Sequence, residues 1–238
     1  MMKFAFALLF LAACAREKVV ESPSRPVDET ATTTSSTARP LEDPKTPPAP
    51  PAVNGPKLAF LDEAAKDPSF VTYRDQLLAA VRARDKKAVL ALSDPSIRTS
   101  FGGDGGAAEL EHVLTEDLFQ ELEQILALGG TFREGMFWAP YVYSAWPEPH
   151  DAFETLAVIA EDVPLRESAD AGAPAIATLS RDLVKRGQGA PGPWTKVETA
   201  DGKTGFVESK LVRSPVDYRA GFIKSDAGWR MNALVAGD

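Results

Sequence analysis

The chain has 238 residues, which is enough for one large domain or two small ones. Its formal net charge of −8 argues against nucleic-acid binding, because neutralising phosphates takes a surplus of lysine and arginine. The single cysteine excludes an internal disulfide and a cysteine-based zinc site, and two histidines leave little material for a metal cluster. We therefore expect no nucleic-acid partner, no metal and no cofactor.

The N-terminus has the pattern of a secretory signal. A short basic start, Met1–Lys3, precedes ten consecutive apolar residues, Phe4–Ala13. Ten residues are too few to cross a hydrocarbon core of about 30 Å, which takes about 20 helical residues. They do match the apolar segment of a signal peptide.

That apolar run ends at Leu11-Ala12-Ala13-Cys14, which resembles the lipobox of bacterial lipoproteins. The resemblance implies that residues 1–13 are removed and that Cys14 is acylated, and several acyl chains anchor a protein stably. Ala15 is not the aspartate associated with inner-membrane retention, so the resemblance implies the periplasmic face of the outer membrane. The alternative is a secreted protein cleaved at an Ala-x-Ala-like site, with a spare thiol.

Residues 14–57 have the composition of a disordered tether. Between Arg16 and Lys57 there are nine prolines, ten serines or threonines and no aromatic residue. Such a stretch buries too little apolar surface to offset its ordering entropy. A flexible coil of this length spans about 35–40 Å, enough to carry a folded domain from a membrane towards the cell wall, although a spacer of unselected length is equally compatible.

Residues 58–154 carry the acidic excess, with 17 acidic and 8 basic side chains. The two stretches that follow, 155–213 and 214–238, each have no net charge. Apolar spacings of three and four predict helices over 69–81, 85–92 and 110–126. Ser69 and Asp85 are the expected N-caps, and residues 97–101 alternate like a strand. We predict a mainly helical acidic domain.

Two features of this domain allow a second interpretation. Six acidic side chains without a basic one lie between Glu109 and Glu123; a solvated helix face is favoured over a site for a cation or a basic partner. Aromatic residues gather between Met136 and Trp146. A buried segment joining two domains is favoured over an exposed ligand platform.

From residue 155 the pattern changes to short strands separated by turn residues, including a hairpin turn at Asp201-Gly202. Five or more strands in about 60 residues predict a small barrel over 155–213. Residues 214–238 read as a hairpin that either extends this barrel or returns to the helical segment. The fold class is therefore α+β.

Three motifs in these strand segments follow one another at set spacings: Val163-x-Leu165-Arg166-Glu167-Ser168, Trp194-x-Lys196-Val197 and Asp201-Gly202-Lys203-Thr204-Gly205-Phe206-Val207. Together they resemble the pattern of bacterial SH3 (SH3b) domains. The resemblance implies a small barrel that binds peptidoglycan stem peptides or other short peptides and is usually non-catalytic.

Five residues are the candidate ligand contacts. Trp194, Phe206 and Tyr218 are the aromatic residues expected to line or flank the groove, and Asp201 and Lys203 are expected to supply polar contacts. Trp194 and Phe206 lie on predicted strands, and for these two residues the alternative, that both fill the barrel core, is slightly favoured over ligand contact.

The C-terminal Gly228-Trp229-Arg230 hairpin, together with the helix pair joined at Arg84-Asp85, is similar to part of NTF2-like cone folds. An intervening sheet is not evident in the sequence.

No nucleophile–base pair or metal motif is recognisable, so no catalytic residue is expected. The favoured function is a lipid-anchored, non-catalytic binding or scaffolding module of the cell envelope, with peptidoglycan or a short peptide as partner. The alternatives are an envelope hydrolase or its accessory subunit, which would use the acidic domain, and a purely structural lipoprotein.

Overall fold

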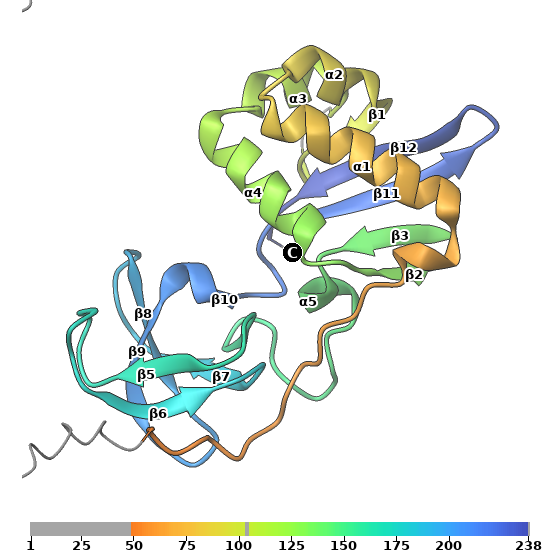
Figure 1. Cartoon of the computed structure of the whole chain (residues 1–238). Coiled ribbons are helices and arrows are strands. Elements are labelled where there is room, and N and C mark those ends of the chain that lie inside the picture. The colour runs from red at the N-terminus through yellow and green to blue at the C-terminus, as the bar shows by residue number, and fades with distance from the viewer. Residues whose placement is uncertain (1–48, 103–104, 238) are drawn as a thin grey trace, which may run out of the picture. The chain divides into compact units, whose positions relative to one another are not determined.

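The computed structural model describes residues 49–102 and 105–237, and these form helices and two mostly antiparallel sheets (Figure 1). The predicted α+β class is confirmed at this level. The predicted signal peptide, Cys14 and residues 15–48 of the predicted tether lie outside the described residues.

The first sheet joins the C-terminal hairpin to strands of the predicted acidic domain. Strand β1 runs parallel to β12, and the other pairs are antiparallel. The order is β1 (Ser93–Arg98), β12 (Gly228–Val235), β11 (Arg219–Ser225), β3 (Met136–Ala139) and β2 (Thr131–Arg133).

This sheet shows how the predicted segments combine. Residues 58–154 are largely helical, but they also contain three strands of the sheet that includes the C-terminal hairpin, so they do not form a helical domain by themselves. The predicted hairpin over 214–238 is present, and it pairs with β3 and β1 rather than with the second sheet. Strands β2 and β3 are only three and four residues long. An alternation of buried and exposed residues over so few positions does not identify a strand in the sequence alone.

Helices α1 and α4 lie against the first sheet (Figure 1). Asp67, rather than the predicted Ser69, caps α1: its carboxylate accepts hydrogen bonds from the Ser69 and Phe70 amides. Asp85 caps α2 as predicted, accepting from the Ala88 amide at 3.0 Å. The helices are η1 (Ala64–Lys66), α1 (Pro68–Arg82), α2 (Lys86–Ala91), α3 (Ala107–Val113), α4 (Glu116–Ala127) and α5 (Tyr141–Ser144).

Aromatic side chains hold α1 on the sheet. The Phe70 ring is fully buried, and its centroid lies 4.2 Å from that of Phe137, 4.9 Å from Trp229 and 5.4 Å from Phe222. Each ring buries a large apolar area and adds a favourable edge-to-face or tilted contact. The core of this part is therefore built from residues more than 150 positions apart in the chain.

The second sheet has seven strands and is wholly antiparallel. Its core is formed mainly by valine and leucine side chains, among them Leu165, Val197 and Val207. A short helix, η2 (Ser209–Leu211), precedes its last strand. The order is β10 (Val212–Arg213), β4 (Thr155–Val158), β7 (Leu183–Arg186), β8 (Trp194–Glu198), β9 (Thr204–Glu208), β5 (Val163–Arg166) and β6 (Ala175–Leu179).

The predicted closed barrel is an open sheet in the structure, because β10 and β6 remain as two edges. The edge of β6 is covered by the chain that precedes the helices. Ala52 forms a parallel bridge with Thr178, and the Val53 amide donates to the Thr178 carbonyl at 3.1 Å. Covering an edge in this way satisfies its backbone groups without closing the sheet.

The same contacts correct the end of the predicted tether. Val53 is only 3% exposed and belongs to the core of the second sheet. The Lys57 ammonium lies 2.9 Å from the Asp182 carboxylate, which is 1% exposed. Residues 50–57 are thus part of the folded structure; their prolines are compatible with the extended backbone needed along a strand edge.

A third apolar cluster lies between α5 and strands β4 and β7. Tyr141 and Val142 pack there with Leu58, Ala157 and Leu183. Of the predicted aromatic cluster, Phe137 belongs to the first core and Tyr141 to this third cluster, and both are fully buried. Burial is therefore confirmed for both residues, and Tyr141 packs against strands of the second sheet, as expected for a joining segment.

Candidate functional site

Trp194 and Phe206 lie on the outer face of the β8–β9 hairpin. Lys196 pairs with Phe206, and Trp194 pairs with Glu208, which places the two aromatic residues diagonally on one face. Val197 and Val207, on the other face, are fully buried. Trp194 and Phe206 are half-buried and do not belong to the core cluster, so the core-filling alternative is wrong.

Both aromatic residues line a cavity of about 660 Å³. Lys196 and Thr195 from β8 complete the hairpin side, and the connection between β7 and β8, residues 186–192, forms the opposite wall. Ala169 and Ser209 also line it. We call this the hairpin cavity.

The wall of the hairpin cavity is tied to the hairpin at both ends. At one end the Gly187 amide donates to the Lys196 carbonyl at 2.8 Å, and a Cβ on Gly187 would lie 2.9 Å from Lys196 Cγ. At the other end the Ser209 hydroxyl donates to the Gly192 carbonyl at 2.7 Å. A side chain at 187 would push the wall away, so glycine is needed for this close approach.

The hairpin cavity is basic. Arg186 and Lys196 line it, and none of its lining residues is acidic. Both cationic side chains are exposed, and neither forms an ion pair with another residue in the described part of the chain. A positive cavity on a protein of net charge −8 is a local departure from the overall balance.

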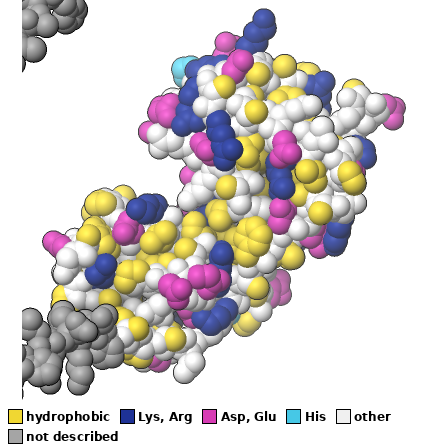
Figure 2. Space-filling model, viewed as in Figure 1, with side chains coloured by type: hydrophobic (Ala, Val, Ile, Leu, Met, Phe, Trp, Pro, Cys, Tyr) yellow, Lys and Arg dark blue, Asp and Glu magenta, His cyan; other side chains and the backbone are white. Residues whose placement is uncertain are grey.

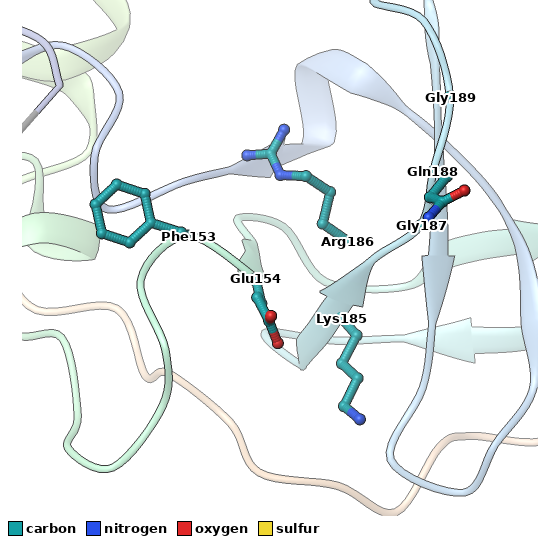
Figure 3. A pocket seen from close by; sticks show the side chains of 7 residues that line it. All are labelled: Phe153, Glu154, Lys185, Arg186, Gly187, Gln188 and Gly189. Atoms are coloured by element: carbon teal, nitrogen blue, oxygen red, sulfur yellow. The ribbon is translucent and has the colours of Figure 1, made fainter.

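A second cavity, of about 640 Å³, adjoins the first (Figure 3). Residues 186–189 line both, and Phe153, Glu154 and Lys185 complete the second. Phe153 is 60% exposed, so its ring offers apolar surface to a ligand. Figure 3 shows the Arg186 side chain on the opposite side of β7 from that of Lys185. We call this the Phe153 cavity.

The structure does not bring Asp201 and Lys203 to either cavity. They form an ion pair with each other at the hairpin turn, where Gly202 has a φ of +81°. The Lys203 ammonium and the Thr199 hydroxyl lower the pKa of the Asp201 carboxyl. In this position the two side chains stabilise the turn.

Tyr218 also lies apart from Trp194 and Phe206. It precedes β11 and lines a different cavity, of about 280 Å³, together with Leu118 and Glu121 of α4. Its carbonyl accepts a hydrogen bond from the Arg213 guanidinium at 2.5 Å. Of the three predicted aromatic contacts, the structure therefore brings two together.

Acidic residues of α4 form ion pairs with arginines that lie outside this helix. Glu116 lies 2.9 Å from Arg84, and Glu123 lies 2.9 Å from Arg82. These arginines lower the pKa of both carboxyl groups. Figure 2 accordingly shows basic and acidic side chains side by side over the helices rather than one acidic patch.

No family model matches this chain, and no curated protein matches it. One solved structure with some similarity to this chain is that of a putative calcium/calmodulin dependent protein kinase II association domain from Xanthomonas campestris. It has a TM-score of 0.24 and 13% sequence identity, and the match covers 75% of this chain and 96% of that one. A likeness of this size carries no argument about fold or function.

None of the helices in the described part of the chain has the length and apolar character needed to cross a bilayer. No group of three or more histidine, cysteine, aspartate or glutamate side chains in residues 49–102 and 105–237 is arranged to hold a metal ion.

Sequence reasoning missed Arg186, Lys196 and Phe153 as site residues. The sequence around a basic residue does not show whether it binds a ligand. That depends on whether the fold places an acidic side chain beside it. The usable signal was the glycine-rich run after Arg186, since glycines permit a close approach of backbone to a neighbouring strand.

Proposed function

We propose that the protein is a lipid-anchored, non-catalytic binding module of the bacterial cell envelope. The second sheet binds short peptides, with the peptidoglycan stem peptide as the favoured ligand. The observation that carries the proposal is the outward position of Trp194 and Phe206 at the hairpin cavity. Half-buried aromatic rings beside a cavity are a common means of binding a small ligand.

The SH3b-like interpretation of the second sheet belongs to this proposal. In its support, each part of the matching pattern falls on a regular element: Val163–Arg166 is β5, the Trp194 motif opens β8, and Asp201-Gly202 turns the hairpin. The first sheet with its covering helices is assigned to the NTF2-like cone class. In support of this proposal, β11 pairs with β3 and β12 pairs with β1, which supplies a sheet that was not evident in the sequence.

Binding is favoured over catalysis by the chemistry of the cavity lining. The residues that line the hairpin cavity offer guanidinium, ammonium, hydroxyl, amide and aromatic groups. They include no carboxylate, thiol or imidazole that would act as a general base near neutral pH. The acidic groups required by the hydrolase alternative lie elsewhere, and three of those on α4 are paired with arginine.

Attachment through an acylated Cys14 places this module at the membrane, and residues 15–49 give it reach towards the wall. The localisation test is mass spectrometry of the membrane fraction, with an acylated N-terminal cysteine as the expected species. A Cys14→Ser variant should leave that fraction. Equal membrane association of this variant would contradict the anchor.

The binding test uses residues 15–238 and soluble muropeptides, the disaccharide-peptides released from peptidoglycan. We expect chemical-shift changes with micromolar to millimolar affinity for the native chain and loss of binding in Trp194→Ala. Thermal unfolding of Trp194→Ala should remain close to that of the native chain, because its ring lies outside the core.

Leu165→Ala is the matched contrast, because Leu165 is fully buried in the same sheet. It should lower the unfolding free energy by about 2–5 kcal/mol. Absence of any chemical-shift change with muropeptides at millimolar concentration would overturn the binding role. A Trp194→Ala variant as unstable as Leu165→Ala would favour the purely structural alternative.

A further inference from the structure

We propose that the ligand presents a carboxylate to Arg186 and lies across both the hairpin cavity and the Phe153 cavity. This inference rests on the proposed peptide-binding function and specifies the chemistry of the peptide. The occupant is a short peptide with a free carboxylate flanked by apolar groups.

The first step is the charge of the site. Arg186 and Lys196 give the hairpin cavity two positive charges with no acidic lining residue. In the Phe153 cavity, Lys185 and Arg186 outnumber the one acidic lining residue, Glu154, so this lining also carries a net positive charge. The two cavities together therefore favour an anionic ligand.

The second step is the availability of Arg186. Three arginines elsewhere in the described chain are held by carboxylates: Arg84 by Glu116, Arg181 by Glu161 and Arg213 by Glu121. The Arg186 guanidinium has no such partner among the described residues and stands clear of Lys185 and Glu154 in Figure 3. A guanidinium offers two parallel N–H donors that match the two oxygens of a carboxylate.

The third step is the position of Arg186 between apolar surfaces. It is the one charged residue that lines both cavities. On one side Phe153 is 60% exposed, and on the other side the Trp194 and Phe206 rings are half-buried. A ligand whose carboxylate meets Arg186 places its neighbouring groups on aromatic surface in both directions.

The backbone between the cavities gives such a ligand room to cross. Residue 189 of the shared wall is a glycine with nothing within 4 Å of where its Cβ would be, whereas Gly187 is packed against Lys196. Gln188 lies beside this open position, where its amide can donate to or accept from a peptide backbone.

The experiment compares one muropeptide in two forms, with its carboxylates free or converted to amides. Amidation removes the charge and changes the shape little. Using residues 15–238 and isothermal titration calorimetry, we expect the free form to bind about tenfold more tightly or better, because hydrogen bonds to charged groups are the stronger class. Arg186→Gln should weaken binding of the free form by a similar factor and leave the amidated form unchanged.

Lys87→Gln is the matched control. Lys87 is an exposed lysine on α2 with no ion pair in the described residues, and it lies outside both cavities. It should bind both forms as the native chain does. Phe153→Ala should weaken both forms, because it removes apolar contact rather than charge.

The outcomes separate the two proposals. If both forms bind the native chain equally and Arg186→Gln has no effect, while Trp194→Ala abolishes binding, the carboxylate inference is wrong and peptide binding stands. If neither form binds the native chain, both proposals are overturned. If Phe153→Ala binds as the native chain does, the ligand does not cross both cavities.

Discussion

Single residues with two roles set much of the stability of the first sheet. Asp67 caps α1 through the Ser69 amide and also accepts a hydrogen bond from the Lys224 ammonium at 2.8 Å. Lys224 belongs to β11, so one carboxylate ties the start of a helix to the C-terminal hairpin. Lys224 and the Ser69 hydroxyl hold the pKa of Asp67 well below its ordinary value.

This pKa shift predicts the pH dependence of folding. Because the pKa is lower in the folded than in the unfolded state, the unfolded state binds more protons as the pH falls. The contribution of Asp67 is therefore present above its unfolded value, about 3.9, and is lost on further acidification. Melting temperatures measured from pH 7 to pH 2 should fall less steeply in Asp67→Asn, which keeps a capping side chain but no charge.

Residue-scale reasoning from sequence succeeded where the signal was local. Gly202 and the flanking β-rich segments predicted the hairpin turn, and Asp85 predicted a helix start; both are confirmed. For Trp194 the sequence favoured a place in the core over ligand contact, and that preference was wrong because alternation identifies two faces of a strand without saying which one is covered. Which face of the strand is buried depends on how the neighbouring strands pack.

At the scale of elements, helix α4 is linked to strand β10 through a buried arginine. Arg213 is 3% exposed, and its guanidinium donates to Glu121 at 2.5 Å and to Gln124 at 2.8 Å. A buried guanidinium without its carboxylate partner is costly, whereas an exposed pair on the same helix contributes little. The pairing of Arg213 is thus expected to matter more than that of Arg82.

Two substitutions on α4 test this difference. Glu121→Ala should lower the unfolding free energy by about 2–3 kcal/mol, because it leaves the Arg213 charge buried with neutral partners only. Glu123→Ala removes the exposed partner of Arg82 and should change it by less than about 1 kcal/mol. Urea denaturation of both variants gives the comparison; equal losses would show that burial of Arg213 has no special effect.

Long-range pairing explains which elements sequence analysis could not assign. The amphipathic pattern over 110–126 predicted one helix, and the structure divides it into α3 and α4 at Thr115, whose hydroxyl accepts from the Leu118 amide. Strand β3 pairs with β11, more than 80 residues later. No local pattern encodes such a partner, so the first sheet was predicted only as isolated pieces.

At the scale of the whole molecule, the folded part of the chain begins at an earlier residue than the composition indicates. Proline content predicted a tether up to residue 57, yet Val53 is buried and Lys57 pairs with Asp182. Removing residues 15–48 should leave the melting temperature unchanged. Removing residues 15–57 should lower it by several degrees, because burying a valine alone contributes about 1.5–3 kcal/mol. Differential scanning calorimetry of the two deletions distinguishes these results, and equal temperatures would place the boundary back at 57.

The way residues 50–58 attach to the second sheet also determines how the module responds to force. The Val53 and Leu58 amides donate to the carbonyls of Thr178 and Arg181, and the Thr178 amide donates back to the Pro51 carbonyl. The Ala52–Thr178 bridge is parallel, so tension applied from the N-terminal side pulls along the paired strands and loads these bonds together in shear. Shear opens a strand less readily than unzipping its hydrogen bonds one at a time. Under the proposed function, the protein is anchored at a membrane and its ligand belongs to a rigid wall. That arrangement would apply such tension, and this attachment would transfer it to β6 and β7 before it reaches the helices.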